Sequence, residues 1–245
     1  MFRVKRAVIM AAGIGSRLRP VTLTTPKPLV KVNGVRMIDT VIRGLIKNGI
    51  REIYVVVGYR KEQFESLKQE YPGITLIYNP WYDTCNNISS LYAARAYLKD
   101  VMILDGDQFI YQDEILAPEF ERSGYNCVWT DKETDEWLLQ VQDGIVTECS
   151  RTGGARGWQL YSISRWNKED GNRLRHHLEI EFEIKKNTGI YWDDVALFCY
   201  PKEYQLGIRK MQAGDLIEID SMEDLAAIDH SYQRNSDELP ERTEK

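Results

Sequence analysis

The chain has 245 residues, of which 43% are hydrophobic and 28% charged, an ordinary balance for a globular protein with one sizeable α/β core. A formal net charge of −5 argues against a nucleic-acid groove, which needs clustered basic residues. No apolar stretch approaches the roughly 20 residues of a membrane span. None of the cysteines forms a CxxC pair, so we expect free, buried thiols and a cytosolic protein: Cys85, Cys127, Cys149 and Cys199.

The first half of the chain alternates strand-like and helix-like patterns. Compact apolar or β-branched runs predict strands over residues 4–10, 53–57, 74–78 and 101–104. Apolar residues at helical spacing, with Gly49 after the first set, predict helices over residues 37–46, 61–69 and 88–98. This alternation predicts an α/β fold with a parallel sheet covered by helices on both faces.

After about residue 125 the pattern becomes less regular and richer in short strands. They are predicted over residues 126–130, 137–142, 145–149 and 159–164, with Asp143-Gly144 as a hairpin turn. A helix is predicted over 173–183, a strand over 216–219, and a last helix after the N-cap Ser221. We interpret residues 1–234 as one domain, divided at about residue 125, and residues 235–245 as a polar tail.

The loop after the first predicted strand contains Gly13-Ile14-Gly15-Ser16-Arg17. Leu18 breaks both the dinucleotide fingerprint GxGxxG and the P-loop pattern. The physical argument for an anion site remains, because glycines let backbone N–H groups approach an anion and Arg17 adds a fork of donors for phosphate oxygens. Open α/β sheets also bind ligands at this end of their strands. For the two glycines alone, an ordinary strand-to-loop turn is the alternative.

Thr22 and Pro26-Lys27-Pro28-Leu29 extend the loop to the pattern GxGxRLxPxTxxxPKPL. This resembles the signature of the nucleotidyltransferase family, which makes nucleotide-sugars and CDP-alcohols from a nucleoside triphosphate and a phosphomonoester. The resemblance implies a Rossmann-like, mixed and mostly parallel sheet flanked by helices, with a nucleotide half of about 1–125 and a smaller β-rich acceptor half of about 126–234. It implies a triphosphate site at Ala12, Gly13, Gly15, Ser16 and Arg17. Lys27 would contact phosphate oxygens near the reacting phosphorus.

Two acidic segments are candidates for a metal site. Asp105 and Asp107 follow a predicted strand and alternate onto one side, and Glu218 and Asp220 do the same far along the chain. Carboxylates suit Mg²⁺, which bridges phosphates in nucleotidyl transfer; acids that merely end a strand are the alternative. The resemblance implies Mg²⁺ on Asp107 and Asp220, with Glu218 as a further candidate. It also implies that Arg17, Lys27 and Asp107 are catalytic residues. Asp105 would belong to the nucleotide site.

Two aromatic-acidic clusters, Glu136-Trp137 and Tyr191-Trp192-Asp193, suggest a pocket for an organic cation, because aromatic faces and carboxylates attract such groups. Either tryptophan alone is equally well read as a core residue. In the glycine-rich segment 150–157, Arg151 and Arg156 are candidates to cover an acceptor phosphate, with a flexible surface hairpin as the alternative. His176 and His177, in a charged helical stretch, are read as solvated.

The order of these segments resembles the bacterial CTP:phosphocholine cytidylyltransferases over about residues 3–230. Asn86 to Leu91 resembles that group's loop before a helix, so Asn86 and Ser90 would read the cytosine edge and ribose; helix capping is the alternative. The resemblance implies CMP transfer from CTP to phosphocholine, giving CDP-choline and pyrophosphate. We expect CTP and a small cationic phosphomonoester or phosphonate as partners, neither nucleic acid nor membrane, and a monomer or homodimer.

Three alternatives stay open. The first is the same reaction with 2-aminoethylphosphonate or phosphoethanolamine as the acceptor, whose primary ammonium suits the same cluster of rings and acids. A sugar-1-phosphate nucleotidyltransferase is disfavoured by the aromatic residues and the Asn86-Asn87 loop. A non-catalytic nucleotide-sensing domain is disfavoured by the presence of Lys27, Asp107 and Asp220.

Overall fold

The computed structural model describes residues 1–235, so most of the predicted polar tail lies outside the described residues. Its strands are β1 (Phe2–Arg3), β2 (Arg6–Ala11), β3 (Lys31–Val32), β4 (Val35–Arg36), β5 (Glu52–Val57), β6 (Ile74–Tyr78), β7 (Val101–Asp105), β8 (Gln108–Ile110), β9 (Glu119–Phe120), β10 (Gly124–Thr130), β11 (Leu138–Gln142), β12 (Ile145–Ser150), β13 (Gly157–Trp166), β14 (Gly207–Lys210) and β15 (Leu216–Glu218). Its α-helices are α1 (Met37–Lys47), α2 (Glu65–Glu70), α3 (Ile88–Ala93), α4 (Lys168–Glu179) and α5 (Met222–Ile228).

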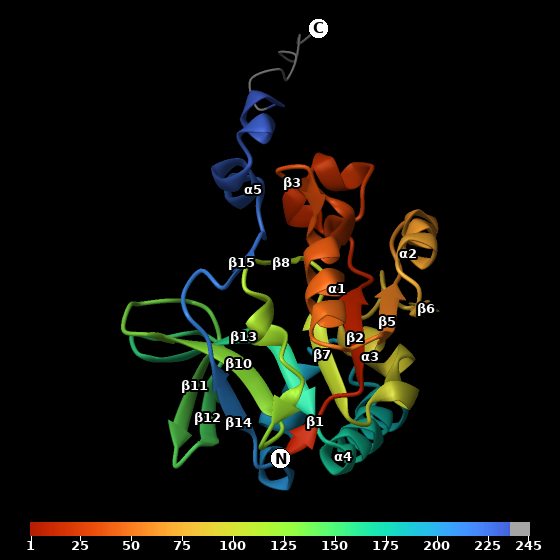
Figure 1. The fold of residues 1–245 in the computed structure, drawn as a ribbon. Helices are drawn as coiled ribbons and strands as arrows, with labels where there is room; N and C mark the ends of the chain where they lie inside the picture. Colours follow the sequence, from red (N-terminus) through yellow and green to blue (C-terminus); the bar gives the residue numbers. More distant parts are fainter. Residues whose placement is uncertain (236–245) are drawn as a thin grey trace, which may run out of the picture.

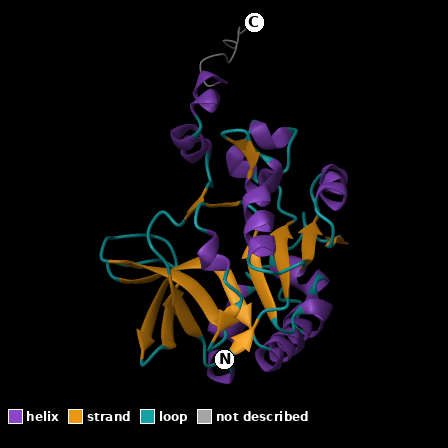
Figure 2. Ribbon diagram, viewed as in Figure 1, coloured by secondary structure: helices purple, strands orange, loops and turns teal. Residues whose placement is uncertain are grey.

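A nine-stranded sheet runs through both halves of the molecule (Figures 1 and 2). Its path is β12-β11-β13-β7-β2-β5-β6, with β10 against β13 and β14 against β10. The four strands β7, β2, β5 and β6 pair in parallel and form the centre of the nucleotide half. This arrangement confirms the predicted α/β class.

Helices cover both faces of the parallel strands (Figure 1). Val41 and Leu45 of α1 pack with Ile9 on one face, and residues of α3 and α4 pack with Val8 on the other. Because neither face meets water, these strands consist of continuous apolar runs, which is why their positions could be predicted closely.

The acceptor half is built around the long strand β13, which pairs antiparallel with β7, β10 and β11. Its pairing of Ile163 with Leu104 joins the two halves through one sheet. The predicted hairpin is present between β11 and β12, where Asp143 and Gly144 adopt φ values of 50° and 75°.

The end of the described chain returns to the nucleotide half. Strand β15 pairs with β8, and Ile219 and Leu225 pack with Leu18 and Met37. Figure 1 shows α5 beside the segment around β3. The division at residue 125 therefore does not hold in space, and this return carries Asp220 to the loop at Arg17.

Several predicted boundaries differ from the structure. The helix predicted over 88–98 ends at Ala93 and continues as a 3₁₀ turn, Arg95–Tyr97. Helix α4 begins earlier than predicted because Asn167 accepts hydrogen bonds from the N–H groups of Glu169 and Asp170. Two π-helical turns, Ile180–Ile184 and Val195–Cys199, and strand β14 were not predicted.

Other predictions concern the burial of single side chains. His177 is buried rather than solvated, because its ring stacks on Tyr200 at 3.7 Å and its Nδ1 lies 2.8 Å from the Tyr204 hydroxyl. Burial lowers the pKa of His177.

All four cysteines are free, but only Cys127 is fully buried. Within residues 1–235, no helix is long and apolar enough to cross a membrane.

Candidate active site

Two adjoining cavities lie at the carboxyl ends of the parallel strands, and they share Arg17, Asp107 and Asp220. The first, of about 280 Å³, is called here the phosphate cavity and is lined by Met10, Ala11, Gly13, Gly15, Ser16, Arg17, Lys27, Pro28, Asp107 and Asp220. The second, of about 260 Å³, is called the acid cavity and is lined by Arg17, Asn87, Asp105, Asp107, Glu136, Trp137, Leu160, Ser162, Tyr191, Asp193, Glu218 and Asp220.

The phosphate cavity depends on the shape of the loop after β2. Gly15 has a φ of 66°, in the left-handed region that favours glycine, and a Cβ atom there would lie 2.9 Å from Cβ of Lys27. The Thr22 hydroxyl donates a hydrogen bond of 2.8 Å to the Gly15 carbonyl. The loop is thus pressed against the Pro26-Lys27-Pro28 segment, which brings the glycine backbone and the lysine to one cavity.

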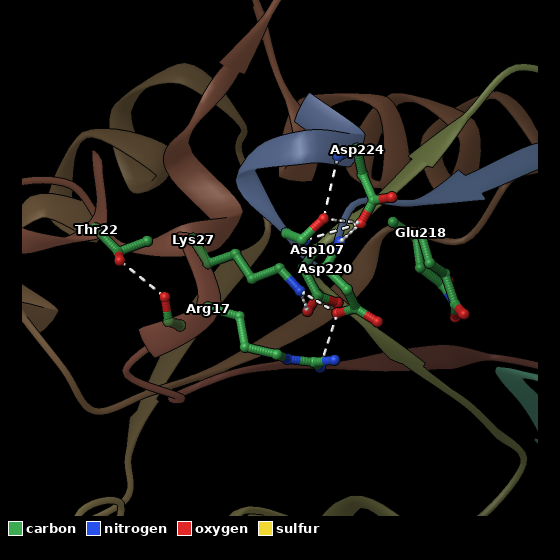
Figure 3. Close-up of polar contacts among 10 residues, drawn as sticks. Arg17, Thr22, Lys27, Asp107, Glu218, Asp220 and Asp224 are labelled. Carbon is green, nitrogen blue, oxygen red and sulfur yellow. Dashed lines mark hydrogen bonds and ion pairs between the residues drawn. The ribbon is translucent and has the colours of Figure 1, made fainter. Parts of the chain in front are cut away.

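Lys27 lies between the two carboxylates predicted to bind metal (Figure 3). Its Nζ is 2.7 Å from Asp107 Oδ2 and 2.7 Å from Asp220 Oδ1, and Arg17 reaches the same Asp220 oxygen at 3.0 Å. Burial alone would lower the pKa of Lys27, but Asp107 and Asp220 outweigh burial and raise it. The ammonium therefore stays charged at the junction of the two cavities.

Asp220 is held in place by the first turn of α5. The Asp224 carboxylate accepts hydrogen bonds from the N–H groups of Asp220 (3.1 Å) and Ser221 (2.8 Å), while the Ser221 hydroxyl accepts one from the Asp224 N–H (3.1 Å). This is the reciprocal capping box that the sequence at Ser221 predicts. It fixes the backbone of Asp220 opposite Lys27 (Figure 3).

The acid cavity concentrates carboxyl groups whose charge is poorly solvated. Burial raises the pKa values of Asp193 and Glu218 to about 7, and burial followed by the nearby Asp107 raises that of Asp105 well above its ordinary value. The pKa of Glu136 is also raised by burial. A bound cation would stabilise the ionised forms of these groups, so the cavity is electrostatically suited to a cationic ligand.

Two aromatic rings line one side of the acid cavity. Trp137 and Tyr191 meet edge to face, with ring centroids 5.8 Å apart. Both were predicted as acceptor-binding residues, as were Glu136 and Asp193, and the structure brings all four into this cavity. Rings beside carboxylates form the kind of site that holds an organic ammonium group.

Three residues predicted to bind nucleotide lie outside the linings of both cavities. The Ala12 carbonyl accepts a hydrogen bond from the Tyr59 N–H, and Ala11 lines the phosphate cavity instead. The Asn86 side chain donates to the Gly189 carbonyl, and the Ser90 hydroxyl accepts from Asn79. These contacts hold loops together, and no side-chain capping hydrogen bond forms at the start of α3. Asp105, predicted on the nucleotide side, lines the acid cavity.

Three predicted acceptor-binding residues also lie outside the linings. Trp192 is 1% exposed and packs with Tyr125 and Trp166 in the core, away from the cavity. Arg151 pairs with Asp194 and lies over Phe198, behind Trp137. Arg156 is 5.4 Å from the ring of Trp129 and lines neither cavity.

Leu160 and Ser162, to which the sequence pattern assigned no role, line the acid cavity, as does Asn87 of the loop predicted to read the cytosine edge and ribose. Leu160 and Ser162 alternate along β13, and a period of two in a strand next to β7 was the only signal for them. Asn87 Oδ1 accepts a hydrogen bond from the Trp192 N–H at 2.9 Å. It therefore links the loop before α3 to the loop that carries Tyr191 and Asp193.

The donor set fits Mg²⁺ bound together with a substrate. Among residues 1–235, no cluster of three or more His, Cys, Asp or Glu side chains is arranged as a metal site. Mg²⁺ commonly uses only one or two carboxylates and completes its shell with water and phosphate oxygens. Asp107 and Asp220 supply two carboxylates that already share one cation, the Lys27 ammonium, beside the phosphate cavity.

Comparison with known proteins agrees with this geometry. The family described as nucleotidyl transferase matches residues 6–120. The 2-aminoethylphosphonate cytidylyltransferase of Lancefieldella rimae is 38% identical, with 92% of each chain covered. The choline-phosphate cytidylyltransferase of Streptococcus pneumoniae is 32% identical, with 89% of this chain and 94% of that protein covered.

A solved structure extends the similarity to the fold. The CTP:phosphocholine cytidylyltransferase from Streptococcus pneumoniae matches with a TM-score of 0.86 and 31% identity, covering 94% of this chain and 99% of that one. Likeness of this extent includes both halves of the molecule. The chain therefore belongs to the nucleotidyltransferase family and is an enzyme of the cytidylyltransferase type.

Proposed function

We propose that the enzyme transfers CMP from CTP to a small phosphonate or phosphomonoester that carries an organic ammonium group, and releases pyrophosphate. The observation that carries the proposal is the meeting of the phosphate and acid cavities at Arg17, Asp107 and Asp220. The triphosphate would occupy the first cavity and the cationic end of the acceptor the second. The acceptor's anionic oxygen would then lie beside the α-phosphorus.

The reaction needs positioning and charge neutralisation more than proton transfer. An acceptor phosphate or phosphonate is anionic near neutral pH, so its oxygen can attack the α-phosphorus in line without a general base. Lys27 and Arg17 would stabilise the charge that develops on the phosphate oxygens. Asp107 and Asp220 would hold Mg²⁺, which supplies Lewis-acid neutralisation of those oxygens when bound.

For the acceptor, the lining favours a primary ammonium such as that of 2-aminoethylphosphonate. Six of the twelve residues that line the acid cavity are carboxylates and two are aromatic. A primary ammonium donates three hydrogen bonds and can use such acceptors directly, whereas a quaternary ammonium relies on aromatic faces. The 38% identity to the 2-aminoethylphosphonate enzyme supports the same choice.

Phosphocholine, which the sequence favoured, is the second candidate. Its support is the pair of Trp137 and Tyr191 and the TM-score of 0.86 to a phosphocholine enzyme. Steady-state pyrophosphate release distinguishes the two, measured with each of the four ribonucleoside triphosphates against 2-aminoethylphosphonate, phosphoethanolamine, phosphocholine and glucose 1-phosphate. We expect the highest kcat/KM with CTP and 2-aminoethylphosphonate.

Other outcomes of the panel have defined meanings. A higher kcat/KM with phosphocholine would replace the first acceptor by the second. Release only with glucose 1-phosphate would contradict the assignment of the acid cavity to a cation. Asp107→Asn is the control for the metal assignment, because it removes one carboxylate charge at nearly constant shape. Near-normal turnover of this variant with saturating Mg²⁺ would contradict that assignment.

A further inference from the structure

Arg151 and Asp194 form an ion pair directly behind the aromatic side of the acid cavity. Arg151 follows β12, and its guanidinium nitrogen is 2.6 Å from Asp194 Oδ1. The Asp194 side chain is 3% exposed, so the pair is half buried. Neither residue lines the cavity.

Each partner also contacts an aromatic residue of the cavity or its support. Asp194 Oδ2 accepts a hydrogen bond of 2.9 Å from the Tyr191 backbone N–H. The Arg151 guanidinium carbon lies 3.9 Å from the ring centroid of Phe198 and 5.8 Å from that of Trp137. Trp137 in turn meets Phe198 edge to face, with centroids 5.6 Å apart. The pair therefore touches the backbone of one cavity ring and lies behind the other.

We propose that Arg151 and Asp194 are positioning residues that act as one brace and fix Trp137 and Tyr191 in the geometry that binds the acceptor cation. The inference rests on the proposed function. The two rings come from segments far apart in the chain, the loop just before strand β11 and the loop between the two π-helical turns. The ion pair joins the second of these loops to the end of β12, where Ser150 pairs with Leu138, the neighbour of Trp137. A buried carboxylate that loses its partner keeps its desolvation cost, so loss of Arg151 disturbs the Tyr191 loop.

The test is a double-mutant cycle on Arg151→Met, Asp194→Asn and the double variant, with steady-state kinetics for CTP and for 2-aminoethylphosphonate and phosphocholine. We expect each single variant to raise KM for the cationic acceptor by about tenfold to a hundredfold, because small displacements of binding groups cost that much. KM for CTP should stay within about twofold, since the phosphate cavity is unchanged. The double variant should be no worse than either single one, because coupled partners are not additive.

The matched control is Arg175→Met. Its side chain is 47% exposed against 46% for Arg151, and it also pairs with a carboxylate, Glu179, at 2.9 Å, but on the surface of α4. This variant should leave both KM values unchanged. Arg151→Lys, which keeps the charge, should recover part of the acceptor affinity.

The outcomes separate the brace from its rivals. A raised acceptor KM in Arg151→Met but not in Asp194→Asn would mean that Arg151 contacts the acceptor directly, and the brace would be wrong. Equal rises in both KM values would indicate a general structural defect and would also overturn it. Wild-type enzyme without turnover on any cationic acceptor would refute the proposed function itself, whereas wild-type turnover with unaffected variants would refute the brace alone.

Discussion

Lys27 holds together the two carboxylates on which the proposed chemistry depends. Its ammonium is 2.7 Å from each of them, and the side chain is 10% exposed. Water therefore cannot easily take the place of the ammonium between the carboxylates. The sequence pattern PKPL identified this residue, but its partners 80 and more positions away were identified only through the family resemblance. Spacing within a strand can pair Asp105 with Asp107, but it cannot show which distant carboxylate faces them.

Replacing Lys27 by Met should lower kcat by about a hundredfold to a thousandfold, because one preorganised donor to a developing oxyanion contributes on that order. Pyrophosphate release at saturating CTP and acceptor measures this. Lys47→Met is the control, since Lys47 pairs with Asp113 at 2.8 Å on the surface away from both cavities. A kcat for Lys27→Met within about threefold of the wild type would show that the ammonium does not act on the reacting phosphate.

The raised pKa of Asp193 predicts that binding of the proposed acceptor depends on pH. Burial, followed by the nearby Asp194, raises its pKa to about 7, and the Tyr125 hydroxyl offsets only part of the shift. Below that pH the carboxyl is neutral and loses its attraction for a cation, so KM for the acceptor should fall as pH rises from about 6 to about 8. The Asp193→Asn variant should show a flatter profile, which separates this effect from titration of the acceptor. Equal pH dependence in both proteins would assign the effect elsewhere.

At the scale of elements, the four parallel strands of the nucleotide half were predicted closely because burial on both faces leaves a clear apolar run. The helices were predicted less well at their ends: α4 begins at Lys168, before the predicted start at residue 173, because Asn167 caps it, and the last predicted turn is π-helical. The turns that shape the site were only partly predictable. Gly15 leaves no room for a side chain because Lys27 lies against it. This requirement comes from a tertiary contact and not from a local preference of the chain.

Helix α5 links local capping to the site. The Asp224→Ala variant removes the capping carboxylate and leaves the Asp220 N–H without its partner. We expect a loss of about 1 kcal/mol in the free energy of unfolding, typical of a lost cap. We also expect kcat to fall by a larger fraction than the free energy of unfolding does. Turnover assays give kcat, and urea unfolding gives the free energy. Glu223→Ala, in the same first turn, is the control, and equal effects of the two variants on kcat would contradict a specific role for Asp224.

At the scale of the whole molecule, two chain segments cross between the halves. Strand β13 joins the acceptor half to the parallel sheet, and the segment from Leu216 returns to the nucleotide half. A linear division of the chain therefore could not predict how the candidate site residues are distributed between the two halves. Trp192 and Arg151 were included because they neighbour site residues in sequence, although the structure places them behind the cavity walls.

The meeting of two cavities at one pair of carboxylates leads to the central claim, that both substrates bind together and react directly. The stereochemical course at the α-phosphorus tests this claim most directly. The substrates are a cationic acceptor and one diastereomer of CTP that carries sulfur on the α-phosphorus. The configuration of the product is determined by ³¹P NMR. A single in-line displacement inverts the configuration, and this is the result that we predict. Retention would require an even number of displacements, through a covalent enzyme intermediate, and would contradict the account.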